Sequence, residues 1–321
     1  MNGGTWTLAL DIGGTKLAAG LVRSDGSVVA HDSVATRGDG SADALFADLI
    51  GLADRVLAAG SVRPDDLVGV GVGCGGPMEY PEGRVSPLNI PAWRGFPLRA
   101  RLQERYGRPA LVDNDAKALA LGEYVVGAGQ GARCLMGMVV STGVGGGIVA
   151  EGQLIHGVRG NAGHIGHVIA FPGGPECGCG ARGCVEGVAS GSGLARRARL
   201  AKAEGLLPDL PASPTGEDVV TAAKRGEPTA VKFVEEAGIA VGRGIAAAAA
   251  LLDLDRVVIG GGVALGAGEL LLRPLRQTLE QEARLDFTRG IEQAVRLSDL
   301  GLIAALAGAA ALLRGLPRHE G

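Results

Sequence analysis

The stretch TWTLALDIGGTKLAAGLVRSDGSVVAHDSVAT, residues 5–36, decides the fold class of this 321-residue chain. It holds three apolar, strand-like segments in a row, and the short turns GGT and SDGS separate them. Apolar runs joined by such short turns predict an antiparallel β-meander at the start of the chain.

Strands and helices alternate after the meander. Apolar side chains recur at helical spacing in residues 41–60 after Ser41, a suitable N-cap, and LVGVGVG (67–73) is typical of a strand buried on both faces. The β-then-α order continues through FPLRARLQERYG and ALVDND. A second cycle follows with CLMGMVVST, a glycine-rich turn at GVGGG, the strand IVAEG and later RVVIGGG and AVRLS. The repeated pattern predicts two similar α/β lobes with a ligand cleft between them.

The predicted domain limits follow from these two cycles. Residues 1–112 form an N-terminal α/β lobe, and residues 113–300 form a C-terminal α/β lobe that contains a metal-binding segment, 164–186. Residues 301–321 contain LIAALAGAAALL, which predicts a buried helix that packs back on the N-terminal lobe.

The composition excludes several classes of protein. With 46% hydrophobic and 20% charged residues the chain fits a soluble globular protein, and its net charge of −3 without a Lys/Arg run argues against nucleic acid or anionic lipid as a partner. No apolar run reaches the roughly 18 residues of a membrane span, and the start of the chain does not resemble a signal peptide. We therefore expect a cytoplasmic protein with a small-molecule partner.

Three glycine clusters stand at strand ends and could bind phosphate through backbone N–H groups. In DIGGTK (11–16) Asp11 can also face Mg²⁺, directly or through water. STGVGGG (141–147) could bind phosphate in the same way from the second lobe, with Thr142 as a side-chain donor. IGGGV (259–263) suits a nucleoside, since bare backbone can lie flat against it. Each cluster has the alternative reading of an ordinary structural turn.

The stretch LVDNDAKALALGE places three polar residues, Asp113, Asn114 and Asp115, where a strand passes into a helix. A carboxylate at this position is often only a helix N-cap. Alternatively, Asp115 accepts the proton of a phosphoryl-acceptor hydroxyl, and Asn114 fixes a neighbouring hydroxyl. Positioning matters more than base strength in phosphoryl transfer.

The segment GNAGHIGHVIAFPGGPECGCGARGCVE (160–186) concentrates metal ligands. One imidazole and three thiolates, from His167, Cys177, Cys179 and Cys184, form the Cys₃His set that closes a tetrahedral, structural Zn²⁺ site. The alternative is three unliganded thiols. If one ring nitrogen of His167 binds zinc, the other can hydrogen-bond a ligand.

Taken together and in this order, these motifs resemble the ROK family of sugar kinases and related repressors, over nearly the whole chain. The matching motifs are DIGGTK, NDA…ALGE, STGVGGG, GHIGH, CGCGARGCVE, IGGGV and the terminal LGLIAALAGAA. The resemblance implies an actin-like, ribonuclease-H-like α/β fold of two lobes, with ATP and Mg²⁺ in the cleft and a structural Zn²⁺ that shapes the sugar site.

The resemblance also implies the roles of individual residues. Asp115 is the general base. The sugar ligands are Gly76, Asn89, Asn114, Asp115, His164, His167 and Glu186. The residues facing the phosphates, Mg²⁺ and nucleoside are Asp11, Gly13, Gly14, Thr15, Lys16, Thr142, Gly143, Gly261 and Gly262. The zinc ligands are His167, Cys177, Cys179 and Cys184.

Two departures from the family pattern bear on the substrate. Members that phosphorylate glucose usually have Glu where this chain has His164, and AGHIGH looks more like bacterial N-acetylmannosamine kinases. The other departure is Lys117, where glucokinases often have Asn; the sequence does not give its effect.

The hypothesis is an ATP-dependent 6-kinase of a hexose or N-acetylhexosamine, with N-acetylmannosamine slightly favoured over glucose. Polyphosphate as donor stays open, and the chain's composition suits a homodimer or homotetramer. The rival class is a sugar-sensing repressor, but such proteins carry a helix-turn-helix before the first phosphate turn, which starts here at residue 11.

Overall fold

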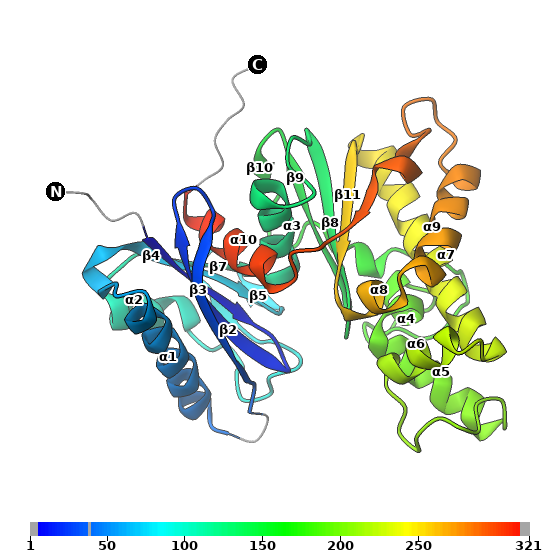
Figure 1. Cartoon of the computed structure of the whole chain (residues 1–321), viewed down its shortest axis with the longest axis horizontal. Helices are drawn as coiled ribbons and strands as arrows, with labels where there is room; N and C mark the ends of the chain where they lie inside the picture. The colour runs from blue at the N-terminus through cyan, green and yellow to red at the C-terminus, as the bar shows by residue number, and fades with distance from the viewer. Residues whose placement is uncertain (1–5, 38–39, 315–321) are drawn as a thin grey trace. The chain divides into compact units, whose positions relative to one another are not determined.

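The computed structural model describes residues 6–37 and 40–314, and its strands and helices follow one another in the α/β order predicted (Figure 1). The chain divides into two compact units. Unit 1 comprises the described residues up to Gly131, residues Gly147–Ala162 and those from Leu300 onward, whereas unit 2 comprises Ala132–Gly146 and Gly163–Asp299.

This division differs from the sequence-based limit between residues 112 and 113. The difference arises because α3 (Asp115–Val126) packs along α10 (Leu302–Arg314) inside unit 1. The two helices touch through glycine: a Cβ added to Gly122 or Gly308 would collide with the other helix's backbone. The predicted C-terminal helix is thus seen up to residue 314, and residues 315–321 of that expectation lie outside the described part.

The first sheet has the strand order β3-β2-β1-β4-β7. Its strands are β1 (Trp6–Ile12), β2 (Lys16–Arg23), β3 (Val28–Ala35), β4 (Leu67–Cys74) and β7 (Ala110–Asn114). The pairs β1–β2 and β2–β3 are antiparallel, which confirms the predicted meander, although Thr5 of the quoted stretch is outside the described residues. Strands β1, β4 and β7 run parallel, so their carboxyl ends meet at one edge.

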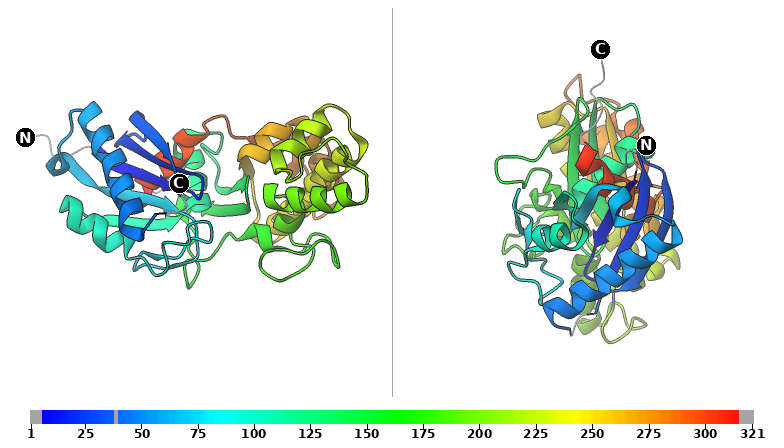
Figure 2. Two further views of the ribbon diagram at one scale, coloured as in Figure 1. Left: turned by 90° about the horizontal axis from the view of Figure 1, so that it is seen from below. Right: turned by 90° about the vertical axis from the view of Figure 1, so that its left-hand side faces the viewer.

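Helices cover both faces of this sheet, as the left view of Figure 2 shows for α1 and α10. On one face Leu8 and Leu10 of β1 pack in a core with α1 (Ala42–Ala59), whose predicted N-cap, Ser41, accepts a hydrogen bond from the Ala44 N–H. On the other face Ala9 packs against α10. Small side chains on this second face let α10 and α3 approach closely. Unit 1 also contains β5 (Met78–Glu79), β6 (Arg84–Val85) and α2 (Leu98–Tyr106).

The second sheet has the order β10-β9-β8-β11-β12. Its strands are β8 (Cys134–Val140), β9 (Val144–Ala150), β10 (Gln153–Leu154), β11 (Arg256–Gly260) and β12 (Val295–Leu297). The prediction of a turn at GVGGG (143–147) was wrong, because β9 already begins at Val144. The glycines serve packing instead: a Cβ on Gly147 would lie 2.7 Å from Lys117 Cα.

The helices of unit 2 lie together on one side of its strands β8 and β11, as Figure 1 shows. They are α4 (Val185–Ala189), α5 (Gly191–Ala203), α6 (Gly216–Lys224), α7 (Pro228–Leu252), α8 (Gly262–Ala267) and α9 (Glu269–Glu282). The long α7 packs against α9 through Gly238 and Gly242. Over residues 6–37 and 40–314, no helix combines the length and apolar character that crossing a membrane requires.

Candidate functional site

The carboxyl ends of β1, β4 and β7 bring two predicted site carboxylates together in unit 1. Asp11 is paired in register with Gly73 of β4, and Asp115 begins α3 directly after β7. A Cβ on Gly73 would lie 3.4 Å from Asp115 Cα and 3.6 Å from Asp11 Oδ1. The two carboxylates therefore flank one bare glycine, a pairing typical of sites that handle a cation and a proton.

The electrostatics of this edge favour a proton on Asp11. Burial and, second to it, the negative charge of Asp115 raise the pKa of Asp11 from its ordinary 3.8 to about 7, although Lys16 opposes the shift. A divalent cation beside Asp11 would favour the ionised form, so the site has the character of a place that exchanges a proton for a metal ion.

This pKa predicts a pH dependence of stability. Between about pH 4 and 7 the unfolded chain has lost the Asp11 proton while the native state keeps it, so the free energy of unfolding falls as pH rises. The limiting slope is about 1.4 kcal/mol per pH unit. Because Asp11 keeps some solvent contact, we expect a total loss of about 2 kcal/mol, roughly half the limit.

Urea unfolding of the wild type and of Asp11→Asn, without nucleotide or Mg²⁺, measures the effect from pH 4 to pH 8. The wild type should lose about 2 kcal/mol relative to the variant, whose amide does not titrate. Parallel curves for the two proteins would show that Asp11 is already ionised at pH 4.

The predicted phosphate turn and sugar residues of unit 1 lie against one another. In the turn the Gly13 N–H donates to Lys16 O at 2.9 Å, which leaves the N–H groups of Gly14 and Thr15 as the candidates for phosphate. A Cβ on Gly14 would collide with Asn89. These contacts place Asn89 beside the turn that the sequence assigned to phosphate.

A second contact joins two predicted sugar residues, Gly76 and Asn114. A Cβ on Gly76 would lie 3.8 Å from Asn114 Nδ2. Asn114 is also the N-cap of α3, since its Oδ1 accepts from the Ala116 N–H at 3.1 Å. The capping role suggested for a carboxylate at this junction thus falls to Asn114, although Asp115 Oδ1 also accepts from Ala116, at 2.8 Å.

In unit 2 the four predicted zinc ligands form a cluster. The ligand atoms of His167, Cys177, Cys179 and Cys184 all lie within 4.8 Å of one another, with Cys177 Sγ 3.7 Å from His167 Nδ1. Cys177 and Cys184 are buried, while Cys179 and His167 face outward. Three sulfurs and one imidazole nitrogen are the donor set of a closed zinc site, so the residues fit Zn²⁺.

The thiol pKa values in this cluster show how firmly the protons that a metal would have to displace are held. Burial raises the pKa of Cys184 to about 12, whereas the Ala181 N–H lowers the pKa of the exposed Cys179. A cation held by these sulfurs would stabilise all three thiolates. The cluster is consequently expected to release protons when it binds zinc.

Glu186 connects the cysteine cluster with the glycine turn after β8. Its Oε2 accepts from the Val144 N–H at 3.0 Å, and its Oε1 lies 3.7 Å from Cys177 Sγ. A Cβ on Gly143 would lie 2.9 Å from Glu186 Oε2, so a larger residue there would displace the Glu186 carboxylate. The predicted sugar residue Glu186 and the predicted phosphate residue Gly143 are therefore neighbours.

The other predicted residues of unit 2 lie around the same region. Gly261 has a φ of 98° and packs on the end of β8, where a Cβ would lie 2.5 Å from Val140 O. An added Cβ on the next residue, Gly262, would lie 3.9 Å from Ser141 Oγ. The ring of His164 lies 6.1 Å from that of His167. Sequence reasoning missed Ser190, which caps α5, while the Gly191 N–H donates to Ser141 O at 2.7 Å.

Sequence reasoning also missed a buried polar cluster next to the β7–α3 junction. Lys117 Nζ lies 3.3 Å from Asp113 Oδ1, and His156 Nδ1 lies 2.9 Å from Asp113 Oδ2. The four-residue spacing of Asp113 and Lys117 was the available signal. It has little weight alone, because a strand end and not a helix carries Asp113.

Comparisons with known proteins place the chain in context. The sequence model described as "ROK family" matches residues 7–315. The glucokinase of Halalkalibacterium halodurans is 36% identical over 317 residues, with 96% of this chain and 95% of that protein covered. The N-acetylmannosamine kinase of Citrobacter koseri is 38% identical over 318 residues, with 96% and 99% covered.

The crystal structure of a ROK family glucokinase from Streptomyces griseus, in complex with glucose and AMPPNP, superimposes with a TM-score of 0.79. The two sequences are 35% identical, and the superposition covers 96% of this chain and 99% of the Streptomyces griseus chain. The predicted actin-like α/β fold of two lobes is thereby confirmed.

Proposed function

Because the chain belongs to the ROK family, we propose that it is an ATP-dependent sugar kinase that phosphorylates the 6-hydroxyl of a hexose or N-acetylhexosamine. The observation that carries the proposal is the pairing of Asp11 and Asp115 on either side of Gly73. Phosphoryl transfer to an alcohol needs both a carboxylate for Mg²⁺ and a carboxylate for the hydroxyl proton. The edge of the first sheet supplies one of each.

The roles follow from the chemistry of the transfer. The 6-oxygen of the sugar forms a bond to the γ-phosphorus, the bond from that phosphorus to the leaving oxygen of ADP breaks, and Asp115 accepts the hydroxyl proton. Asp11 and Lys16 face the phosphates together with the N–H groups of Gly14 and Thr15. Mg²⁺, when bound, neutralises charge on the phosphates.

Further groups are assigned to nucleotide and sugar on the same reasoning. Thr142 and Gly143 are proposed for the phosphates, and Gly261 and Gly262 for the nucleoside. Sugar hydroxyls are assigned to Asn89, Asn114, Glu186 and the two histidines His164 and His167, with Gly76 at the sugar's edge. The four-residue cysteine and histidine cluster would hold a structural Zn²⁺ that fixes the orientation of the His167 ring.

The substrate within this class is proposed from His164. An imidazole can donate a hydrogen bond to a 2-acetamido group, whereas the Glu of glucose-specific members accepts from two hydroxyls. This favours N-acetylmannosamine. Glucose has equal support from the relatives, because the glucokinase and the N-acetylmannosamine kinase are similar to this chain at 36% and 38% identity.

The test is ADP release with Mg-ATP and, separately, glucose, N-acetylglucosamine, mannose or N-acetylmannosamine. We expect N-acetylmannosamine to give the highest kcat/KM and His164→Glu to move the preference toward glucose by roughly 10-fold or more, the scale of one hydrogen-bonding group. A wild-type preference for glucose would place the substrate choice elsewhere. Absence of turnover with all four sugars would contradict the kinase itself.

Two further expectations, on the phosphoryl donor and on the oligomeric state, stay predictions. Polyphosphate in place of ATP belongs in the same assay, because glycine turns can hold either phosphate chain. The homodimer or homotetramer predicted from composition is measured by light scattering of the purified protein.

A further inference from the structure

Lys117 is completely buried, although an ammonium group loses its hydration there. It lies on α3 two residues beyond Asp115. Its Nζ donates hydrogen bonds to Gly160 O at 2.6 Å and His156 O at 3.4 Å, and it forms an ion pair with Asp113 Oδ1 at 3.3 Å. Two carbonyl acceptors and one carboxylate thus replace much of the hydration that the ammonium group loses.

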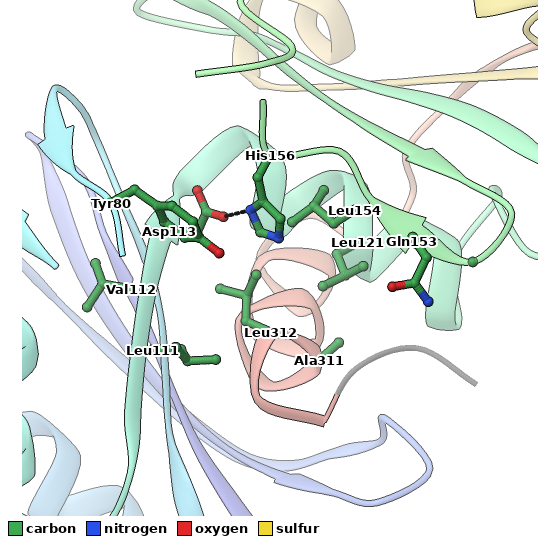
Figure 3. Close-up of a pocket in the computed structure, with 11 residues that line it drawn as sticks. Tyr80, Leu111, Val112, Asp113, Leu121, Gln153, Leu154, His156, Ala311 and Leu312 are labelled. Atoms are coloured by element: carbon green, nitrogen blue, oxygen red, sulfur yellow. Dashed lines mark ion pairs between the residues drawn. The ribbon is translucent and has the colours of Figure 1, made fainter. Parts of the chain in front are cut away.

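The Asp113 carboxylate extends this arrangement to the start of the helix. It is 2% exposed. Its Oδ1, besides facing Lys117, accepts from the Asn114 N–H at 2.7 Å, and its Oδ2 lies 2.9 Å from His156 Nδ1. Figure 3 shows this carboxylate pointing at the imidazole ring of His156. One carboxylate thus joins the ammonium of Lys117, the backbone of Asn114 and the segment that carries His156.

A third segment is attached through Tyr80. Its ring stacks on the His156 ring, with centroids 4.9 Å apart and an interplanar angle of 20°. Gly160, whose carbonyl holds Lys117, has a φ of 73°, and a Cβ there would lie 2.6 Å from Tyr80 Cβ. Tyr80 follows Gly76 and precedes Asn89 in the chain, so the segment that carries both proposed sugar residues contacts the same cluster.

The apolar surroundings of the cluster strengthen the attraction between its charged groups. The pocket in Figure 3 is lined beside Asp113 and His156 by apolar side chains, among them Leu121, Leu154 and Leu312. Low polarity on this side raises the attraction between the Lys117 ammonium and the Asp113 carboxylate. A buried ion pair is nevertheless a poor way to gain stability, since apolar residues of the same volume often do as well or better. Its position, between two segments that carry proposed site residues, needs another reason.

We propose that Lys117 is a positioning residue for phosphoryl transfer. Together with Asp113 and His156 it holds the β7–α3 junction, and with it Asn114 and Asp115, in the orientation that the reaction requires. The inference rests on the proposed kinase function. Since phosphoryl transfer depends chiefly on positioning, a displacement of about 1 Å at the base can cost roughly 100-fold in rate.

The first variant is Lys117→Met, which keeps the length of the side chain and removes the charge. We expect kcat per active site to fall by roughly 100-fold, while the Kd for Mg-ATP changes by less than about 3-fold, because the contacts described for the cluster include none of the residues proposed for the nucleotide. Active sites are counted by the stoichiometry of nucleotide binding, so misfolded protein does not enter kcat. Lys224→Met, at an exposed lysine of α6, is the matched control and should leave kcat unchanged.

The second variant, Asp113→Asn with Lys117→Met, separates positioning from stability. The single change leaves a buried carboxylate without its lysine and should lower Tm, whereas the double change removes both charges and should restore Tm. We expect kcat to stay low in the double variant. The substrates are glucose and N-acetylmannosamine with Mg-ATP.

Recovery of kcat together with Tm in the double variant would make Lys117 structural only and overturn the proposal. So would a folded Lys117→Met protein with wild-type kcat. A wild-type protein that phosphorylates neither sugar would instead contradict the proposed function. If Lys117→Met does not fold, kcat of the double variant decides alone.

Discussion

Replacing Asp115 by alanine is expected to lower kcat for sugar phosphorylation by roughly 10²- to 10⁴-fold, the contribution of a general base in the right place. The hydroxyl of the acceptor would then keep its proton and lose its orientation. Structural damage should be small, because the Ala116 N–H, which Asp115 also contacts, keeps its hydrogen bond to Asn114, the N-cap of α3. The Kd for the sugar should change by at most about 10-fold, the value of one hydrogen bond.

The assay is ADP release under saturating sugar and Mg-ATP, with sugar binding measured by calorimetry. Asp43→Ala is a matched control, since Asp43 is the first-turn acid of α1 in the same unit. Its loss should alter only stability, by about 1 kcal/mol, through the first turn of α1 and the exposed ion pair with Arg101. Wild-type turnover by Asp115→Ala would remove the proposed mechanism, whereas a loss of sugar binding equal to the loss of kcat would make Asp115 a ligand and not the base.

Much of the fold could be predicted because local patterns in the sequence agree with it. The three opening strands, the Ser41 cap of α1 and the terminal apolar helix each follow from spacing and turn residues nearby in the chain. The limits of the two units could not be predicted in this way. They depend on α3 meeting α10 through Gly122 and Gly308, which are 186 residues apart in the chain.

The features of the candidate site also differ in whether they depend on local sequence or on contacts between distant segments. Glycine clusters at strand ends and the Cys₃His set carry their chemistry in a short stretch of sequence, so the sequence could suggest them. The link from Glu186 to the Val144 N–H, and the burial of Lys117 against Gly160, join segments distant in the chain. A lysine in a helix is usually exposed, so its burial here could be known only from the packing.

The cysteine cluster carries the other large expected effect. Cys179→Ser should abolish stoichiometric zinc binding and raise the Kd for the sugar by roughly 10- to 100-fold, the range found when the support of a metal site is lost. The two effects are linked through His167 and Glu186. His167 would lose the metal that fixes its ring, and Glu186 lies 3.7 Å from Cys177 Sγ. Cys179 is the suitable position because its side chain is exposed, so serine creates no cavity.

Zinc content by elemental analysis and sugar binding by calorimetry are measured on the same preparations. Cys134→Ser is the matched control, as Cys134 lies outside the cluster and donates to Leu252 O at 3.3 Å, a contact that a hydroxyl can keep. It should retain one zinc and the wild-type Kd. A Cys179→Ser protein that loses zinc but binds sugar normally would separate the metal from the sugar site. The metal would then serve folding alone, since a closed four-ligand site offers no position for substrate.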